Sequence, residues 1–365
     1  MIRVLIVEDS AVLRELLNYI LGSDPDIEVV GMAKDGMEAA DSVKRLHPDA
    51  ITMDINMPRM NGFEATRKIM GNNPTPIIIV SGHHDDSEVA TTFRAMEAGA
   101  TIVLSRPVGI GDPKFQVQAR ELVQIVKLMS EVKVVRRLTF SRPYKGPHAT
   151  KSEISDAVAG EGSKVKLIAI GASTGGPVAL KTLLSLLPDN FGIPIAIVQH
   201  MTAGFVQGFA QWLGKASGKT VQVAEAGSYL DPGSVFVAPD GCHMKVSGSG
   251  RIILANGEPE NGLRPAVSSF FRSVAEAYGP RAVGVLLTGM GKDGAVELGL
   301  MRTMGSLTLA QDEASSVVHG MPGEAIRIGA ARYILSLEAI GATLGSLTGD
   351  ASQQLSAGRE AKERV

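Results

Sequence analysis

The sequence predicts an α/β protein of two domains, a flavodoxin-like unit followed by a doubly wound parallel-sheet unit. In both halves, short runs of β-branched residues alternate with amphipathic stretches, which is the pattern of parallel strands joined by crossover helices. The length of 365 residues suits two domains. Hydrophobic residues make up 44%, charged residues 20% and aromatic residues 4%, which is typical of a globular α/β protein and not of a disordered or fibrous one.

The first unit is expected at residues 1–130, with five strands and helices between them. The expected strands are Val4–Val7, Glu28–Ala33, Ala50–Met53, Ile77–Ser81 and Thr101–Leu104. A last helix is expected at about Phe115–Glu131. Strands that alternate with helices in this way predict a flavodoxin-like sheet, whose ligands bind beyond the carboxyl ends of the strands.

A linker is expected at residues 131–162, because the hydrophobic periodicity fades there and glycine and proline become frequent. Its first part is basic: between positions 131 and 150, five basic residues against Glu131 give +4. The basic residues are Lys133, Arg136, Arg137, Arg142 and Lys145. A solvated tether is the simpler interpretation, and a dedicated binding patch is the alternative.

The second unit is expected at residues 163–348, and a polar tail at 349–365. The expected strands are Val165–Ile170, Pro194–Gln199, Ser234–Ala238 and Ala282–Thr288. The expected helices are Val178–Leu187, Phe205–Ala216 and Ala266–Tyr278. The sequence shows no internal repeat of the solenoid type.

Charge and cysteine content exclude several classes of protein. Lysine and arginine total 36 against 38 acidic residues, a net charge of −2 that argues against a nucleic-acid partner or a membrane-surface role. The single cysteine, Cys242, excludes an intramolecular disulfide and a multi-cysteine zinc site. The sequence contains neither a signal peptide nor an apolar run of the ~18 residues that span a bilayer. We therefore expect a cytoplasmic protein without direct membrane insertion.

Three carboxylates are expected on one rim of the first sheet. Glu8 and Asp9 follow the first expected strand and Asp54 follows the third, so all three emerge at carboxyl ends of parallel strands. Like charges in one pocket require a bound cation or raised pKa values, and Mg²⁺ accepts such hard oxygen ligands. Ser81 and Arg106 end or follow the other two strands, where a hydroxyl and a cation would help to hold a phosphoryl group on Asp54. The alternative is that the carboxylates merely cap the following helices.

These motifs resemble the receiver domains of two-component response regulators over about residues 1–130. The resemblance rests on Val-Glu8-Asp9-Ser, Met53-Asp54-Ile-Asn56-Met57-Pro58-Arg-Met-Asn-Gly62, Val-Ser81 and Arg106-Pro107. It implies that Asp54 accepts the phosphoryl group and that Ser81 and Arg106 are switch residues. It also implies a Mg²⁺ cofactor held by Glu8, Asp9, Asp54 and the backbone carbonyl of Asn56.

The chain departs from this family at two positions. The cation after the fifth strand is usually lysine, whereas Arg106 carries a planar guanidinium that is bulkier and a less compact point charge. The position two or three residues upstream is often aromatic, but here it lies among Ile102, Val103 and Leu104. We therefore expect no coupling through an aromatic switch.

A candidate nucleophile, Ser173, lies in the second unit. Gly171-Ala-Ser173-Thr-Gly175 follows an apolar run and precedes a helical pattern, so it fits G-x-S-x-G in the context that exposes a serine on a sharp turn. The start of the next helix offers N–H groups for an oxyanion. A dinucleotide fingerprint is one alternative, but it requires glycine in place of Ser173 and an acidic residue in place of His200. A structural tight turn with an incidental serine is the other.

A serine nucleophile needs a base, most often histidine, that a third group orients. Four of the seven histidines lie in the first unit or the linker: His47, His83, His84 and His148. His200 follows an expected strand and so shares the rim with Ser173. His243 and His319 are expected at the surface or in contact with substrate.

Asp293 is the candidate for the third group. It follows an expected strand and a glycine turn, Thr288-Gly-Met290-Gly-Lys-Asp293, which brings it to the same rim. Asp240 is the weaker candidate, and a role as a helix cap is the alternative for Asp293. Three separate strand-to-loop junctions that supply serine, histidine and aspartate favour a Ser-His-Asp site.

The second half resembles the catalytic domain of chemotaxis-type protein-glutamate methylesterases, the CheB family, over about residues 163–347. The resemblance rests on Ile170-Gly-Ala-Ser173-Thr-Gly-Gly-Pro177, Gln199-His200-Met201, Ala238-Pro-Asp-Gly241 and Leu287-Thr-Gly-Met290-Gly-Lys-Asp293-Gly294. Such enzymes hydrolyse γ-glutamyl methyl esters on the cytoplasmic helices of chemoreceptors, releasing methanol, and many also deamidate receptor glutamines.

This resemblance implies a role for each residue and a set of partners. Ser173 is the nucleophile, His200 the base and Asp293 the group that orients the imidazole. The backbone N–H groups of Thr174 and Met290 are the oxyanion donors, and the ester chemistry needs no cofactor. The implied partners are the cytoplasmic domains of methyl-accepting chemoreceptors and the histidine kinase of a chemotaxis-type system.

The family also implies that the unphosphorylated receiver covers the catalytic rim and that phosphorylation favours an open form. Two other functions are weighed against this one. The first is a catalytically idle scaffold with the receiver as a docking switch, which an intact Ser-His-Asp set argues against. The second is a small-molecule esterase, which would need a deep, aromatic-lined pocket that the few aromatic residues do not favour.

Overall fold

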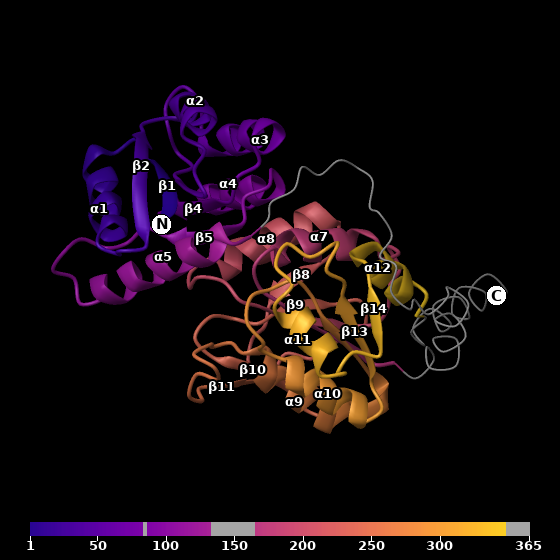
Figure 1. Ribbon diagram of the computed structural model, residues 1–365. Coiled ribbons are helices and arrows are strands. Elements are labelled where there is room, and N and C mark those ends of the chain that lie inside the picture. Colours follow the sequence, from indigo (N-terminus) through magenta and orange to yellow (C-terminus); the bar gives the residue numbers. More distant parts are fainter. Residues whose placement is uncertain (83–85, 133–164, 348–365) are drawn as a thin grey trace. The chain divides into compact units, whose positions relative to one another are not determined.

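The chain divides into two compact units between residues 140 and 141. The structure, a computed structural model, describes residues 1–82, 86–132 and 165–347 (Figure 1). The expected tail and the expected linker, with its basic residues, therefore lie outside the described residues, apart from Glu131 and Val132. Among the described helices, none combines the length and the apolar character needed to cross a bilayer.

The first unit is a five-stranded parallel sheet with helices on both faces (Figure 1). Its elements are β1 (Ile2–Val7), α1 (Ala11–Gly22), β2 (Ile27–Ala33), α2 (Gly36–Leu46), β3 (Ala50–Met53), α3 (Gly62–Asn72), β4 (Ile77–Ser81), α4 (Asp86–Glu97), β5 (Ile102–Ser105) and α5 (Phe115–Ser130). The strand order is β2-β1-β3-β4-β5, with α1 packed against α5, and α3 packed against both α2 and α4. The predicted flavodoxin-like fold is confirmed. The expected bounds match those of β3 and β4, differ by one residue for β2 and β5, and differ by two residues at the start of β1.

Side chains just before the helices fix where several of them begin. Ser10 precedes α1 and its Oγ accepts a hydrogen bond from the Leu13 N–H. Asp35 accepts hydrogen bonds from two N–H groups at the start of α2, and Asn61 accepts one from Glu64 in α3. These side chains satisfy N–H groups that have no partner inside the helix.

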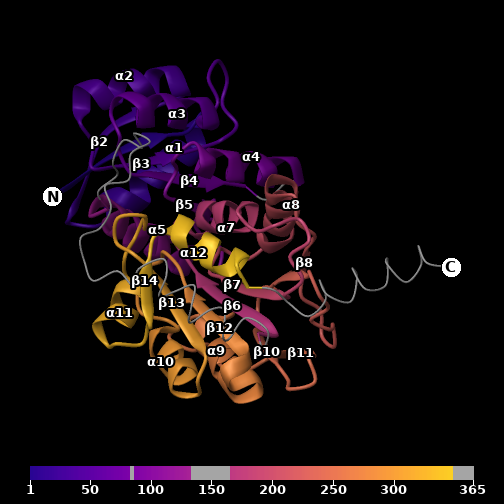
Figure 2. The same cartoon turned by 90° about the vertical axis from the view of Figure 1, so that its right-hand side faces the viewer.

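The second unit is a seven-stranded parallel sheet with a separate antiparallel hairpin. Its elements are β6 (Leu167–Ala172), α7 (Gly176–Ser185), β7 (Ile195–Gln199), α8 (Val206–Ser217), β8 (Val221–Val223), β9 (Val235–Val237), β10 (His243–Val246), β11 (Ile252–Ala255), α9 (Val267–Tyr278), η2 (Gly279–Arg281), β12 (Ala282–Leu286), α10 (Ala295–Thr303), β13 (Leu307–Gln311), α11 (Met321–Arg327), β14 (Tyr333–Leu335) and α12 (Leu337–Gly345). Figure 2 shows α7, α8 and α12 above the strands, and α9 and α10 below them. The predicted doubly wound sheet is confirmed, although the sequence analysis did not identify β8, β10, β11, β13 or β14.

The order of the strands places a reversal of direction in the middle of each sheet. In the second unit the order is β14-β13-β12-β6-β7-β9-β8, so the chain runs outward from β6 to one edge and from β12 to the other. In the first unit the corresponding pair is β1 and β3. A reversal of this kind opens a crevice at the carboxyl ends of the two strands, which is where doubly wound folds bind their ligands.

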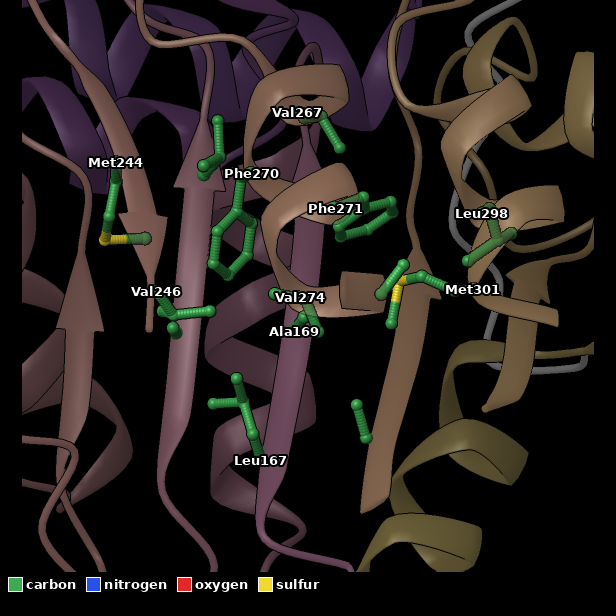
Figure 3. Close-up of a cluster of buried hydrophobic side chains, with 14 of the residues drawn as sticks. Leu167, Ala169, Met244, Val246, Val267, Phe270, Phe271, Val274, Leu298 and Met301 are labelled. Carbon is green, nitrogen blue, oxygen red and sulfur yellow. The ribbon is translucent and has the colours of Figure 1, made fainter. Parts of the chain in front are cut away.

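The core of the second unit fixes the position of α9 against the sheet (Figure 3). Phe270 and Phe271 are fully buried, and they pack with Leu167 and Ala169 of β6 and with Met301 of α10. Burial of each such side chain contributes about 2–3 kcal/mol relative to its exposure to water. The first turn of α9 is therefore held firmly at the rim of the sheet.

Candidate active site and acidic pocket

The turn after β6 carries Ser173 to the rim of the second sheet. Gly175 has a positive φ of 78° just before α7, and a Cβ there would lie 2.6 Å from the Cβ of Val317, so glycine is needed for both reasons. The Ser173 N–H donates to the Thr288 carbonyl at 3.0 Å. A Cβ at Gly289 would lie 2.7 Å from that of Ser173, so the loop after β12 packs directly on the serine.

The pairing of β6 with β7 brings His200 next to Ser173. Ala172 lies opposite Gln199, and the His200 N–H donates to the Ala172 carbonyl at 2.9 Å. Ser173 follows Ala172 and His200 follows Gln199, so the two residues lie side by side at the ends of the paired strands. Among the described residues, no hydrogen bond joins the Ser173 Oγ to the imidazole. Hydrogen bonds of this kind often tighten only when substrate is bound.

Asp293 contacts the other side of the imidazole. The His200 Nε2 lies 3.0 Å from the Asp293 Oδ2, so Nδ1 is the ring nitrogen left for Ser173. The Asp293 carboxylate is 3% exposed and accepts hydrogen bonds from the N–H groups of Val267 at 2.6 Å and Ser268 at 3.1 Å. Asp293 therefore accepts hydrogen bonds from the start of a helix, as the capping alternative expects. That helix is α9, however, and not α10, which follows Asp293 in the sequence.

The electrostatics of Asp293 favour its charged form. Burial alone would raise the pKa of this carboxyl group, but hydrogen bonds from His200, Ser268 and the Val267 N–H outweigh burial and hold the pKa below its usual 3.8. An ionised carboxylate in this position fixes the orientation of the imidazole and stabilises the imidazolium that forms when the base takes a proton.

The two predicted oxyanion donors lie in the loops beside Ser173. Thr174 is 5% exposed and precedes Gly175, and Met290 follows Gly289. The Gly289 N–H donates to the Val318 carbonyl at 2.9 Å, which holds this loop in place. Within the part of the chain that the structure describes, neither the Thr174 N–H nor the Met290 N–H donates a hydrogen bond.

The remaining candidates of the second unit have structural contacts. His243 is 2% exposed, its Nε2 contacts the Glu258 carbonyl at 2.9 Å, and its Nδ1 accepts from the Ala266 N–H at 3.3 Å. The expectation that His243 lies at the surface is therefore wrong, because β10 carries the ring into the interior, and contact with substrate stays a prediction. His319 is half-buried and pairs with Gly289, and Asp240 accepts from the Gly204 N–H.

Gln199 belongs to the motif Gln199-His200-Met201, but no role was expected for it from the sequence. Gln199 is 4% exposed, and its Nε2 donates to the carbonyls of Ser173 at 2.9 Å and His200 at 2.7 Å. A polar residue at the end of an otherwise apolar strand was the available signal.

The three carboxylates of the first unit meet at the carboxyl ends of β1 and β3. One oxygen of each of Glu8, Asp9 and Asp54 lies within 4.8 Å of those of the other two. The Arg106 Nη2 lies 2.6 Å from the Asp54 Oδ1 and 4.0 Å from the Glu8 Oε2. Ser81 is buried, and its carbonyl accepts from the Arg106 N–H at 3.0 Å.

These carboxylates are not helix caps, so that alternative is wrong. Ser10 caps α1 and Asn61 caps α3. Burial, together with the charge of Asp54, raises the pKa of Glu8 to about 7 from 4.5, against the opposing charge of Arg106. Burial also raises the pKa of Asp54 above 3.8, although Arg106 opposes it.

The donor set suits a hard cation. The Asp54 Oδ2 is buried and has no hydrogen-bond partner within the described residues, so it is an oxygen that a ligand would satisfy. Asn56 lies two residues beyond Asp54 and is exposed. Clustered carboxylate oxygens are ligands that Mg²⁺ accepts.

Comparisons with known proteins match both units. A model described as "Response regulator receiver domain" matches residues 4–114, and one described as "CheB methylesterase" matches residues 168–344. The protein-glutamate methylesterase/protein-glutamine glutaminase 1 of Syntrophus aciditrophicus (strain SB) is 55% identical over 349 residues, which cover 96% of this chain and 99% of that protein.

Two further proteins are similar to this chain. The protein-glutamate methylesterase/protein-glutamine glutaminase of Nitrosospira multiformis is 53% identical over 351 residues, which cover 96% of this chain and 98% of that protein. The crystal structure of the CheB methylesterase catalytic domain of Thermotoga maritima is 37% identical, with a TM-score of 0.49, and covers 50% of this chain and 99% of that one.

Proposed function

The chain belongs to the CheB family of protein-glutamate methylesterases/protein-glutamine glutaminases and is a carboxylic ester hydrolase, and from this premise we propose that it hydrolyses γ-glutamyl methyl esters on chemoreceptors with Ser173, His200 and Asp293. The observation that carries the proposal is the 3.0 Å contact of His200 with Asp293, beside a serine that strand pairing holds next to the same histidine. The rim of the sheet thus supplies nucleophile, base and orienting acid.

In the first half of the reaction, the Ser173 Oγ attacks the ester carbonyl carbon while His200 takes its proton. The carbonyl oxygen becomes an oxyanion, and the N–H groups of Thr174 and Met290 stabilise it. One such donor is typically worth about 3 kcal/mol of the barrier. The bond to the methoxy group then breaks, and the proton on His200 leaves with it as methanol.

In the second half, His200 takes a proton from water, whose oxygen attacks the glutamyl-serine ester. The bond to the Ser173 Oγ breaks, the serine regains its proton, and a glutamate side chain is released. With a glutamine substrate the leaving group is ammonia, so the same residues account for deamidation. Throughout, Asp293 keeps the imidazole in one orientation.

We further propose that phosphorylation of Asp54 in the receiver raises the hydrolytic rate, with the phosphoryl group supplied by the histidine kinase of a chemotaxis-type system. Glu8, Asp9, Asp54 and the Asn56 carbonyl would hold Mg²⁺. When bound, this ion supplies positive charge that offsets the charge of the carboxylates and the phosphoryl oxygens. Arg106 reaches the Asp54 Oδ1 and adds a second positive charge at the same place.

The test of the catalytic proposal is methanol release from a soluble chemoreceptor fragment that carries glutamate methyl esters. Wild type is expected to release methanol, and Ser173→Ala, which removes only the nucleophilic hydroxyl, is expected to release none. Release that survives in Ser173→Ala would contradict the proposal, and receptor methylation unaffected by either protein would favour the idle scaffold.

The test of the regulatory proposal adds a small phosphodonor and Mg²⁺ to the same assay. The rate is expected to rise for wild type and to stay at its basal value for Asp54→Asn. Equal rates for the two proteins, with and without phosphodonor, would contradict control by phosphorylation while leaving the esterase proposal intact.

A further inference from the structure

The side chain of Gln199 joins the two residues at the centre of the proposed reaction. Its Nε2 donates one hydrogen bond to the Ser173 carbonyl at 2.9 Å and one to the His200 carbonyl at 2.7 Å. Both acceptors are carbonyl oxygens, so only the amide nitrogen can face them, and the orientation of the amide group is fixed.

This arrangement leaves the amide oxygen without a hydrogen-bond partner. The Gln199 Oε1 is buried and unpaired within the described residues, and it faces Gly176 so closely that a Cβ there would clash with it. A buried, unpaired polar atom lowers stability, and an apolar side chain of similar shape would avoid that loss. The need to fill space therefore does not explain why an amide stands at this position, and the hydrogen bonds of its nitrogen must have a role of their own.

Peptide geometry indicates what this contribution is. The Ser173 carbonyl and the Thr174 N–H belong to one planar trans peptide group, so they point in opposite directions. The Ser173 carbonyl is held by Gln199 and also by the Gly176 N–H at 2.8 Å. These two bonds fix the direction of the Thr174 N–H, and hydrogen bonds to the carbonyl also polarise that N–H.

We propose that Gln199 is a positioning residue for the hydrolysis: it aligns the Thr174 N–H with the developing oxyanion and holds His200 next to Ser173. This proposal rests on the proposed function of Ser173 and His200. Gln199 does not touch the substrate, so its contribution lies in the transition state and affects kcat rather than KM.

The first test is Gln199→Met, which keeps the length of the side chain and removes the donor. We expect kcat for methanol release from the methylated receptor fragment to fall about 10- to 100-fold with KM unchanged, less than the ~100- to 1000-fold loss of a whole oxyanion donor. Labelling of Ser173 by a fluorophosphonate, whose adduct also places an oxygen at the oxyanion position, is expected to slow by a similar factor.

The matched control is Thr308→Val, which removes a buried hydroxyl near the start of β13, away from the carboxyl ends of the strands. The Thr308 Oγ1 donates to the Ala330 carbonyl at 2.9 Å and accepts from the Arg332 N–H at 3.0 Å. This variant is expected to lose thermal stability without losing kcat. A fall in kcat as large as that of Gln199→Met would show that general destabilisation explains the effect, and would overturn the proposal.

The second test is Gln199→Glu, which has nearly the same shape. A protonated carboxyl group can donate one hydrogen bond to these carbonyls, whereas the ionised group can donate none and repels them. The kcat of this variant relative to wild type is therefore expected to fall as pH rises. A ratio that is constant with pH would overturn the proposal, and so would a kcat of Gln199→Met equal to that of wild type. Wild type that neither releases methanol nor labels at Ser173 would instead refute the proposed function.

Discussion

The acidic pocket of the first unit and the Ser-His-Asp site of the second lie at the same place in related folds, yet their carboxylates behave in opposite ways. Both sites follow the two central strands where the sheet order reverses. Asp54 and Asp293 are almost equally buried, at 1% and 3% exposed. Nevertheless the pKa of Asp54 is raised and that of Asp293 is lowered.

The difference comes from the donors and the charges around each carboxylate, because Asp9 adds a like charge beside Asp54. Asp293 receives two backbone N–H groups from the start of α9 and a contact from His200. The side chain of Asp54 has a contact from Arg106 on one oxygen, while its other oxygen has no hydrogen-bond partner within the described residues. A carboxylate whose hydrogen-bond donors come from the protein is stable in its charged form. A buried carboxylate with fewer donors needs a bound ion or group to stabilise its charge.

The largest effect that this comparison predicts is that of Asp293→Asn. The amide keeps the shape but favours the wrong tautomer of His200, a change that typically lowers kcat about 10⁴-fold in Ser-His-Asp enzymes. Methanol release measures it. Asp240→Asn is the matched control, since the amide oxygen can still accept from the Gly204 N–H, and it is expected to retain near-normal kcat. Equal rates for both variants would remove Asp293 from the proposed site.

Glu8→Gln is expected to have a smaller effect, on stability. The folded-state pKa of Glu8, about 7, lies above its ordinary 4.5, so the folded state binds the proton more tightly. Without Mg²⁺, wild type therefore loses stability as pH rises from about 4.5 to 7, and the variant, which cannot ionise, does not. At pH 8 the variant is expected to be more stable by roughly 3 kcal/mol, which is the difference between a pKa of about 7 and one of 4.5 at 1.36 kcal/mol for each pKa unit.

Calorimetric unfolding of the full chain in a chelator measures this difference between pH 4 and pH 8. Glu15→Gln, at an exposed position of α1, is the control and is expected to follow wild type. A Glu8→Gln variant that is less stable than wild type at pH 8 would contradict the prediction, because it would show that the ionised Glu8 carboxylate stabilises the folded pocket.

Mg²⁺ is expected to stabilise the first unit and leave the second unchanged. Free Mg²⁺ at 100 times its dissociation constant adds about 2.7 kcal/mol to the stability of the unit that binds it. Hydrogen exchange resolves the two units, with protection expected to rise in β1 and β3 only. Asp9→Asn, which neutralises an exposed ligand, should reduce this gain. Equal protection of β6 and β12 would contradict a site confined to the acidic pocket.

The smallest predicted effect concerns Arg106→Lys. Lysine is a more compact point charge, so it is expected to increase the stimulation by a phosphodonor severalfold while the basal rate stays constant. Arg106→Met, which has no charge, is the companion variant and should reduce the stimulation. Stimulation that is the same with arginine, lysine and methionine would exclude a role for this side chain in transmission.

Residues at the ends of predicted strands could be placed from the sequence, but the backbone donors to Asp293 could not. Asp54, Ser173 and His200 each follow a short apolar run, and parallel strand ends meet at one edge of a sheet. The backbone donors to Asp293 come from the first turn of α9, whose closeness to Asp293 is set by the packing of Phe270 and Phe271. No local sequence pattern records such a long-range contact.

Short elements and buried polar side chains were missed for a related reason. β13 has five residues and β14 three, too few for a clear periodicity. The ring of His243 is buried because β10 carries it into the interior, and no hairpin was expected from the sequence at this position. Gln199 acquires its two acceptors only when β6 and β7 pair.

The most direct test of the comparison is the rate of methanol release by wild type, Ser173→Ala and Asp54→Asn, each with a chelator and then with Mg²⁺ and a phosphodonor. The account holds that the Ser-His-Asp site is complete without added groups and that the acidic pocket depends on Mg²⁺ and a phosphoryl group. Wild type and Asp54→Asn are therefore expected to have the same basal rate in chelator. That rate then rises with Mg²⁺ and phosphodonor only where Asp54 is present, and Ser173→Ala releases no methanol under any condition. A basal rate that vanishes in chelator, or release that persists without the serine hydroxyl, would contradict the account.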